Sequence, residues 1–192
     1  SRRVEGRVYR HGGAIPDEVR PVEVVGYQRR WPSELATLAQ ELRQYELADR
    51  GAIEHIGSTS VPGLAAKDVI DIQIRVPVID EPGMMTAFER NGYRRRPETW
   101  NNLEATRTGD VPKLVFAPPA NARWCNVQVR TDGPTGARDA LLFRDCLRQD
   151  SQLRDAWGGF KVALAESLAD GDLLAYGRVK QPAWTVLMRA AD

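Results

Sequence analysis

Two spacings of apolar residues recur along the chain, one typical of helices and one typical of strands. Residues 31–42 open with Trp-Pro, which suits the first turn of a helix, and then place an apolar residue at every third or fourth position. Residues 69–76 instead alternate apolar with polar residues. We expect them to form a strand whose isoleucines share one face, so that Asp71, Gln73 and Arg75 share the other.

The same spacings, together with turn and capping residues, predict the remaining elements. The predicted strands cover residues 22–25, 53–56, 114–116 and 124–129. The predicted helices cover residues 82–90, 137–149, 151–168 and 172–190. Strands in the first two thirds of the chain and helices in the last third indicate an α+β fold.

Four residues set the expected ends and breaks of these helices. Gly92 is placed to end the helix at 82–90 in the left-handed conformation, and Asp150 is placed to cap the helix that follows it. Asp172 is expected to begin the last helix. Pro182 is expected to kink or interrupt that helix, because proline lacks an amide hydrogen.

Residues 1–21 carry five arginines without the apolar spacing that would bury them. We expect a flexible basic arm here, with a solvated terminus as the preferred interpretation and contact with nucleic acid or phosphate as the alternative. Residues 22–192 are then expected to form one domain.

The composition narrows the class of function. The chain has 192 residues, of which 42% are apolar and 28% charged, as in ordinary globular domains. Its 27 basic and 26 acidic residues leave a net charge of +1, which argues against binding to nucleic acid or to an anionic membrane. With 2 cysteines and no run of about 18 apolar residues, we expect a cytoplasmic protein without a disulfide framework or a membrane span.

A site for phosphates is predicted where the strand at 53–56 ends. Gly57 and Ser58 follow this strand, and small residues let backbone amides approach a phosphate, to which the Ser58 hydroxyl adds a hydrogen bond. Asp71 lies on the next predicted strand, where its carboxylate is suited to hold a Mg²⁺ ion that bridges phosphate oxygens. Gly-Ser turns and single aspartates are common, so this spacing alone does not specify a nucleotide site.

The sequence around these residues resembles the signature of the GrpB family. The run HIGSTSVPGLAAKDVIDI at residues 55–72 carries the resemblance. Trp-Pro at residues 31–32 and the segment LFRDCLR at residues 142–148 support it, and the blocks have the spacing of the family. The resemblance covers about residues 22–190.

The resemblance implies a nucleotidyltransferase-like mixed β-sheet with packed helices, in a family whose members occur alone or fused to dephospho-coenzyme A kinase. It implies that Gly57, Ser58 and Thr59 hold nucleotide phosphates and that Asp71 binds Mg²⁺. It also implies that four residues of the helical third contact the triphosphate or the substrate, namely Arg144, Lys161, Tyr176 and Lys180.

Three positions depart from the pattern of a two-metal nucleotidyltransferase. Gln73 stands where a second carboxylate is usual, and Asn126 and Gln128 stand where the family has histidines. Amide side chains cannot act as general bases, although they can bind a base, a sugar or a metal-bound water. These three residues are therefore predicted to contact the substrate in a site that has few acids.

His55 and Lys67 each have two interpretations. His55 is suited to act as a base, a metal ligand or a donor to phosphate, but its flanking isoleucines favour a role in ordering the turn. Lys67 either neutralises phosphate as a point charge or has no part in the chemistry. In the first interpretation Lys67, Asp71 and Ser58 are the predicted catalytic residues. Lys113 is a weaker candidate, and residues 94–96 are expected to form an exposed basic loop.

Two functions remain open. The first is a Mg²⁺-dependent nucleotidyltransferase that acts on a nucleoside triphosphate and a small-molecule acceptor, by positioning and charge neutralisation. The second is a non-catalytic module that binds a nucleotide, another anion or a protein partner in connection with coenzyme A synthesis. The missing carboxylate at Gln73 favours the second, whereas Asp71 and the Gly-Ser turn favour the first. Acyl chemistry at Ser58 is disfavoured, because the sequence offers neither an evident base nor a GxSxG turn.

Overall fold

The structure, a computed structural model, describes residues 22–45, 52–96, 99–106, 109–133, 136–168 and 173–190. In chain order the elements are α1 (Trp31–Gln44), β1 (Ala52–Ile56), the 3-10 turn η3 (Ser58–Ser60), β2 (Ile70–Val76), α2 (Glu81–Arg90), β3 (Arg94–Arg95), α3 (Thr99–Asn102), β4 (Leu103–Thr106), β5 (Gly109–Ala117), β6 (Cys125–Thr131), α4 (Gly136–Gln149), α5 (Ser151–Ser167) and α6 (Leu173–Ala190). The predicted arm at residues 1–21 and the predicted helix start at Asp172 lie outside the described residues.

Within the described residues, six strands form one mixed sheet in the order β1-β2-β6-β5-β3, with β4 paired to β5. β2 and β6 run parallel, and the other pairs are antiparallel. The parallel register places Asp71 beside Asn126 and Gln73 beside Gln128. The predicted α+β class, the mixed sheet and the helical last third are therefore confirmed.

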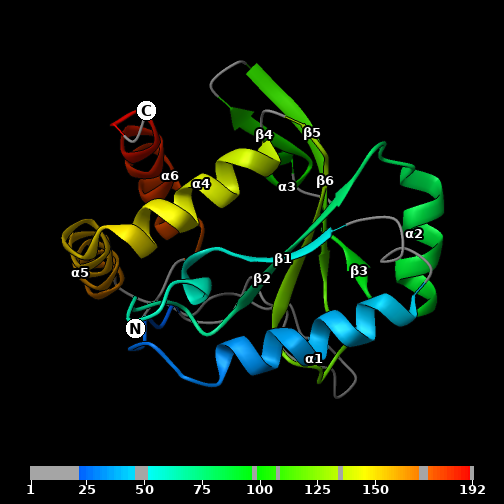
Figure 1. The fold of residues 1–192 in the computed structure, drawn as a ribbon, viewed down its shortest axis with the longest axis horizontal. Coiled ribbons are helices and arrows are strands. Elements are labelled where there is room, and N and C mark those ends of the chain that lie inside the picture. Colours follow the sequence, from blue (N-terminus) through cyan, green and yellow to red (C-terminus); the bar gives the residue numbers. More distant parts are fainter. Residues whose placement is uncertain are drawn as a thin grey trace, which may run out of the picture.

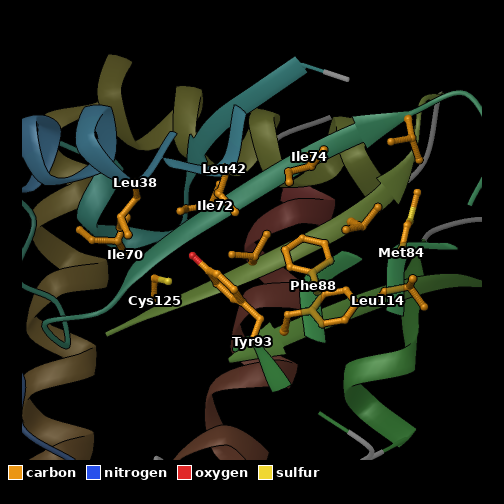
Figure 2. Packing of buried hydrophobic residues seen from close by; sticks show 14 of the residues in the cluster. Leu38, Leu42, Ile70, Ile72, Ile74, Met84, Phe88, Tyr93, Leu114 and Cys125 are labelled. Carbon is orange, nitrogen blue, oxygen red and sulfur yellow. The ribbon is translucent and has the colours of Figure 1, made fainter. Parts of the chain in front are cut away.

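α1 and α2 cover one face of the sheet, and α4, α5 and α6 lie on the other side (Figure 1). Apolar side chains of β2, β5 and β6 pack there with Leu38 and Leu42 of α1 and with Met84 and Phe88 of α2 (Figure 2). Phe88 stacks on Phe116 of β5, with 4.0 Å between the ring centroids. Full burial of a large apolar side chain contributes about 1.5–3 kcal/mol, so this face supplies the main core.

A second apolar cluster joins the three C-terminal helices to the segment between β1 and β2. Phe143, Trp157 and Met188, from α4, α5 and α6, pack together with Val61 and Leu64 of that segment. Since the same segment contains η3, the turn after β1 and the C-terminal helices form one packed unit.

The strand predicted at residues 22–25 is wrong. Val25 pairs only with Ala66, through two main-chain hydrogen bonds of 2.9 Å, and no ladder continues from that pair. The reason is that the partner segment is a loop that is extended at Ala66 alone, so apolar residues without an adjacent strand edge do not form a strand.

The exposed loop predicted at residues 94–96 is also wrong in part. Arg94 and Arg95 form β3, which pairs with the end of β5. Main-chain pairing to an available strand edge creates β3, and side-chain spacing does not show such pairing. For the same reason the apolar pattern does not predict the short elements α3 and β4.

The predicted helix ends agree with the structure at Gly92 and Asp150. Gly92 has a φ of 77°, and the Asp150 carboxylate accepts a hydrogen bond from the Leu153 amide at 2.9 Å. α6 continues through Pro182, so the proline does not interrupt it. No helix in the described part of the chain is both long and apolar enough to cross a bilayer.

The second face of the sheet is polar, and α4 begins over it. Gln73 is fully buried there; its amide nitrogen donates to Glu54 of β1 at 2.9 Å and to the Ala137 carbonyl of α4 at 3.2 Å. Its oxygen accepts from Arg130 of β6 at 3.2 Å. Arg130 is 4% exposed and also makes a two-pronged pair with Glu104 of β4, at 2.7 and 2.8 Å. These bonds offset the cost of burying polar groups on this face.

Arg130→Met removes the cation from this network and leaves Glu104 without its two-pronged partner. We expect the free energy of unfolding to fall by about 3–5 kcal/mol, because breaking a buried ion pair from one side leaves a charge without compensation. We expect a loss toward the lower end of that range, because Lys113 remains 3.6 Å from Glu104 and still compensates part of its charge. Urea unfolding followed by circular dichroism measures the loss.

The double variant Arg130→Met with Glu104→Leu is the matched control, since apolar residues can replace a buried ion pair at little cost. We expect it to recover part of the lost stability, because Lys113 then loses its partner Glu104. Equal losses in the single and double variants would show that the pair does not carry the network.

Candidate functional site

Asp71 lies where β1, β2 and β6 meet. It faces Ile56, the last residue of β1, in the antiparallel pair and lies beside Asn126 in the parallel pair. Gly57 follows β1 directly and approaches the carboxylate so closely that a β-carbon at this position would lie 2.5 Å from Asp71 Oδ2. Gly57 also has a φ of 70°, so a residue with a side chain would be strained and would collide with Asp71.

Thr59 and His55 hold the turn after β1 from inside. Thr59 is 1% exposed. Its hydroxyl donates a hydrogen bond to the Val69 carbonyl at 3.1 Å and lies 3.0 Å from Nε2 of His55. Because the hydroxyl hydrogen is already used, Nε2 carries the proton and donates to Thr59. Burial lowers the pKa of His55 to about 4 against the pull of Asp71, and two nearby arginines add to the shift. The neutral imidazole therefore has the turn-ordering geometry that its flanking isoleucines favour.

Arg144 and Arg148 of α4 bind the backbone carbonyls on either side of this turn. Arg144 donates to the His55 carbonyl at 3.2 Å and also pairs with Asp145 at 2.7 Å. Arg148 donates twice to the Ser60 carbonyl, at 3.0 and 2.7 Å. The two guanidinium groups thus support the turn from the helical side, and a contact of Arg144 with a triphosphate stays a prediction.

The two amides of β6 point toward Asp71, on the face where alternation predicts them. Asn126 Nδ2 donates to Asp71 Oδ1 at 3.0 Å, and Gln128 Nε2 donates to the same oxygen at 3.3 Å. The Gln128 oxygen accepts from Arg130 at 2.7 Å. Gln73, predicted to contact the substrate, is instead fully buried, and both ends of its amide are bonded to protein groups.

All four lysines of the chain lie within electrostatic reach of Asp71, whereas the other 23 of its 27 basic residues are arginines. Burial lowers the pKa of all four lysines, and the negative charge of Asp71 opposes part of that shift at Lys67, Lys113, Lys161 and Lys180. Lys113 pairs with Glu104 at 3.6 Å. The other three, called the lysine cluster below, form no ion pair within 4.0 Å with any carboxylate of the described residues.

Tyr176 of α6 brings two members of the lysine cluster together. Its ring, in a residue that is 2% exposed, lies 5.3 Å from Nζ of Lys67 and 5.9 Å from Nζ of Lys180, distances at which an aromatic face attracts a cation. Lys161 of α5 is also 2% exposed and donates to the carbonyl of Ala65, two positions before Lys67. The predicted residues of α5, α6 and the segment before β2 therefore converge.

Burial and mutual repulsion make the lysine cluster easy to deprotonate. Burial lowers the pKa of Lys161 to about 7, and repulsion from Lys180 and Lys67 adds to the shift. Burial first and Lys180 second lower the pKa of Lys67 to about 8, and burial also lowers the pKa of Lys180. An anion that entered this site would relieve the repulsion, so the cluster suits a ligand with several negative charges.

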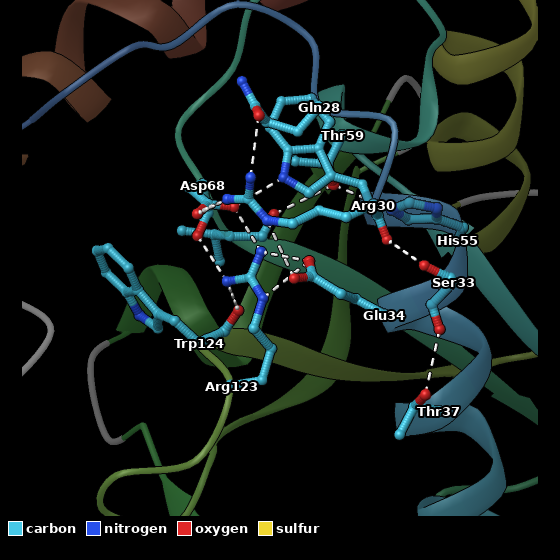
Figure 3. A network of polar contacts seen from close by, with 12 residues as sticks. Gln28, Arg30, Ser33, Glu34, Thr37, His55, Thr59, Asp68, Arg123 and Trp124 are labelled. Carbon is cyan, nitrogen blue, oxygen red and sulfur yellow. Dashed lines mark hydrogen bonds and ion pairs between the residues drawn. The ribbon is translucent and has the colours of Figure 1, made fainter.

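Asp68 follows Lys67 in the chain but does not neutralise the cluster, because other donors hold its carboxylate. Arg30 donates to it at 2.6 Å, Trp31 Nε1 at 2.7 Å and Arg123 at 2.5 Å (Figure 3). Burial raises the pKa of Asp68, but these bonds lower it more, so the pKa lies below its usual value. The network anchors the segment before β2 to α1 and leaves Lys67 without a counter-ion on that side.

The protein groups around Asp71 supply few of the oxygen ligands that the predicted Mg²⁺ site needs. Among the residues that the structure describes, no group of three His, Cys, Asp or Glu residues is placed to hold a metal ion. Magnesium requires oxygen ligands in near-octahedral geometry, whereas Asn126 and Gln128 direct amide nitrogens at the carboxylate. Mg²⁺ binding therefore rests on the family resemblance alone.

The sequence did not reveal the hydrogen-bond partners that show which of the predicted site residues are held by the protein. No motif marks Arg130, Glu104 or the Ala65 carbonyl, because each is brought to its partner by the sheet or by helix packing. One signal in the sequence points to the lysine cluster, which is the presence of only four lysines in a chain with 27 basic residues.

The family model described as GrpB protein matches residues 21–189 of this chain. Among curated relatives, a dephospho-CoA kinase from Mycolicibacterium paratuberculosis is 34% identical over 179 residues, which cover 84% of this chain and 44% of that protein. The chain thus spans less than half the length of this relative.

Among solved structures, the conserved protein GrpB from Enterococcus faecalis has a TM-score of 0.69 at 26% identity, and the match covers 88% of this chain and 96% of that chain. The Cid1 poly(U) polymerase reaches a TM-score of 0.48 at 10% identity, over 74% of this chain and 41% of that one, and so bears on neither fold nor reaction here. The family model and the GrpB structure confirm the resemblance seen in the sequence. The chain belongs to the GrpB family.

Proposed function

We propose that the lysine cluster and the turn after β1 bind the polyphosphate chain of a nucleoside triphosphate. The observation that carries the proposal is the convergence of Lys67, Lys161 and Lys180 without a paired carboxylate among the described residues. Lys161 is buried and Lys67 and Lys180 are half-buried, so their ammonium groups repel one another until an anion enters. A triphosphate matches them better than a monophosphate or a diphosphate does, because it carries more negative charge.

Each part of the site has its own role in this proposal. Gly57 lets the turn pass close to Asp71, and Ser58 offers a hydroxyl at the start of η3. Lys161 and Lys180 bring positive charge from α5 and α6, and Lys67 brings it from the segment before β2. Lysine suits this task because its ammonium group is a compact charge with three donors.

Transfer of a nucleotidyl group to a small-molecule acceptor is the second candidate function. Asp71 supports it, because Oδ1 takes both amide donors while Oδ2 receives no hydrogen bond from a described residue. In this mechanism Oδ2 takes the proton of an acceptor hydroxyl as that hydroxyl attacks the α-phosphorus and pyrophosphate leaves. Release of pyrophosphate only when an acceptor is present would distinguish transfer from binding alone.

Lys180→Met removes one charge of the cluster and should weaken the binding of ATP. For the unmodified chain, ATP at about 100 times its Kd should raise the free energy of unfolding by about 2.7 kcal/mol, which is a rise of about 5 to 10 °C in the midpoint for a domain of this size. In Lys180→Met we expect the affinity to fall at least about tenfold, the loss typical of one charged hydrogen bond. Titration calorimetry and thermal unfolding measure the two effects.

Arg178→Met is the matched control, because Arg178 is an exposed cation on the same helix and lies outside the lysine cluster. It should leave the affinity unchanged. ADP and dephospho-coenzyme A, the latter taken from the name of the kinase relative, should bind more weakly than ATP because each has fewer phosphates in a row. Equal losses in the two variants, or no midpoint rise with any nucleotide, would rule out this site.

The affinity for ATP should fall as the pH rises from about 7 to about 9. In the free protein the pKa of Lys161 is about 7 and that of Lys67 is about 8, so both amines lose their protons across this interval. The bound anion favours the charged amines, and binding must therefore take up protons that become scarcer as the pH rises. Titration calorimetry in two buffers of different ionisation enthalpy measures the proton uptake.

Lys161→Met should remove the part of this dependence near pH 7 and keep the part near pH 8. The ligand-free chain should show the opposite trend, because the unfolded chain holds lysine protons that the folded chain has lost, so its stability rises with pH in the same window. An ATP affinity that does not change with pH would exclude a part for either amine.

A further inference from the structure

Lysine is rare in this chain except around Asp71. Only four of the 27 basic residues are lysines; burial lowers the pKa of all four, and the charge of Asp71 opposes part of that shift in each. Arginine supplies the positive charge everywhere else, including exposed helix positions such as Arg178. An ammonium group differs from a guanidinium group in being compact and in being able to lose its proton, so this property sets the site apart from the rest of the chain.

We propose that the lysine cluster, and not a divalent cation on Asp71, neutralises the bound polyphosphate. This inference rests on the proposed function, because it specifies how the triphosphate is held.

The surroundings of Asp71 suit a carboxylate that is held by the protein. Oδ1 accepts from the amides of Asn126 and Gln128, at 3.0 and 3.3 Å, and Gly57 lies against Oδ2. A Mg²⁺ ion needs oxygen ligands at about 2.0–2.1 Å in a near-octahedral arrangement. The neighbouring amides present N–H groups to the carboxylate, and these groups stabilise its negative charge without a metal.

The sign of the surrounding charge also disfavours a divalent cation at Asp71. The three amines of the lysine cluster have no paired carboxylate among the described residues, and Lys113 adds a fourth amine whose partner is Glu104. Each ammonium group would repel a cation bound at Asp71 and would attract a polyanion bound beside it. The site is therefore complementary to the free polyphosphate.

Asp71 stabilises the cluster only while the site has no ligand. Burial lowers the pKa of each lysine of the cluster, and the charge of Asp71 opposes part of that shift. When a polyanion arrives, the ligand takes over this role, and the carboxylate then repels the phosphates. Removal of the Asp71 charge should therefore strengthen anion binding at a pH where the amines are protonated.

Titration calorimetry with ATP at about pH 6 tests the inference, in EDTA and in excess Mg²⁺. For the unmodified chain we expect free ATP to bind roughly three- to tenfold more tightly than its Mg²⁺ complex, because the metal cancels charge that the lysines would otherwise meet. Asp71→Asn keeps the shape of the side chain and should tighten the binding of free ATP roughly five- to tenfold. Asp132→Asn, beyond the far end of β6, is the matched control and should change neither value.

Tighter binding in Asp71→Asn together with weaker binding in Mg²⁺ supports the inference. Binding that requires Mg²⁺ and is lost in Asp71→Asn would overturn it and leave the proposed function intact. Absence of ATP binding under every condition would overturn the proposed function, and the inference with it. If Asp71→Asn does not fold, the comparison with and without Mg²⁺ on the unmodified chain decides alone.

Discussion

The central strands place charged and amide side chains on a face that a helix covers, so each of these groups needs a partner inside the protein. Arg130 meets much of this need, because one guanidinium group joins Glu104 of β4, Gln73 of β2 and Gln128 of β6. Gln128 in turn donates to Asp71. The carboxylate of the site is thus the last member of a hydrogen-bond chain that begins in the buried part of the sheet, and its position depends on that chain.

Regular spacing was sufficient to predict the elements that bury one face, such as β2 and α5, and the alternation along β2 and β6 placed Asp71 and Asn126 on the same face. It could not predict what Gln73 does. Its partners Glu54 and Arg130 are 19 and 57 positions away, and alternation tells which face a residue takes but not which neighbour it meets there. β3 was missed for a related reason, since the edge of β5 creates that strand and the arginines that form it carry no strand pattern.

The family motif contains residues with two different tasks. Thr59 and His55 are buried and bonded to each other, and they hold the turn, while Arg148 supports it from α4. Gly57 and Ser58 are left partly exposed at the turn, where a ligand can reach them. A resemblance names all of these residues together, and only the hydrogen bonds show which of them shape the site and which remain available.

The scarcity of lysine also bears on the covalent chemistry of this protein. Acylating and aldehyde reagents attack neutral primary amines and do not attack guanidinium groups in the same way, so on most proteins they modify many surface lysines. Here the side-chain amines gather near one carboxylate, and a pKa of about 7 or 8 leaves a large share of Lys161 and Lys67 neutral under ordinary conditions. Amine modification would therefore be confined, among the side chains, to the neighbourhood of Asp71, and bound phosphate would protect it.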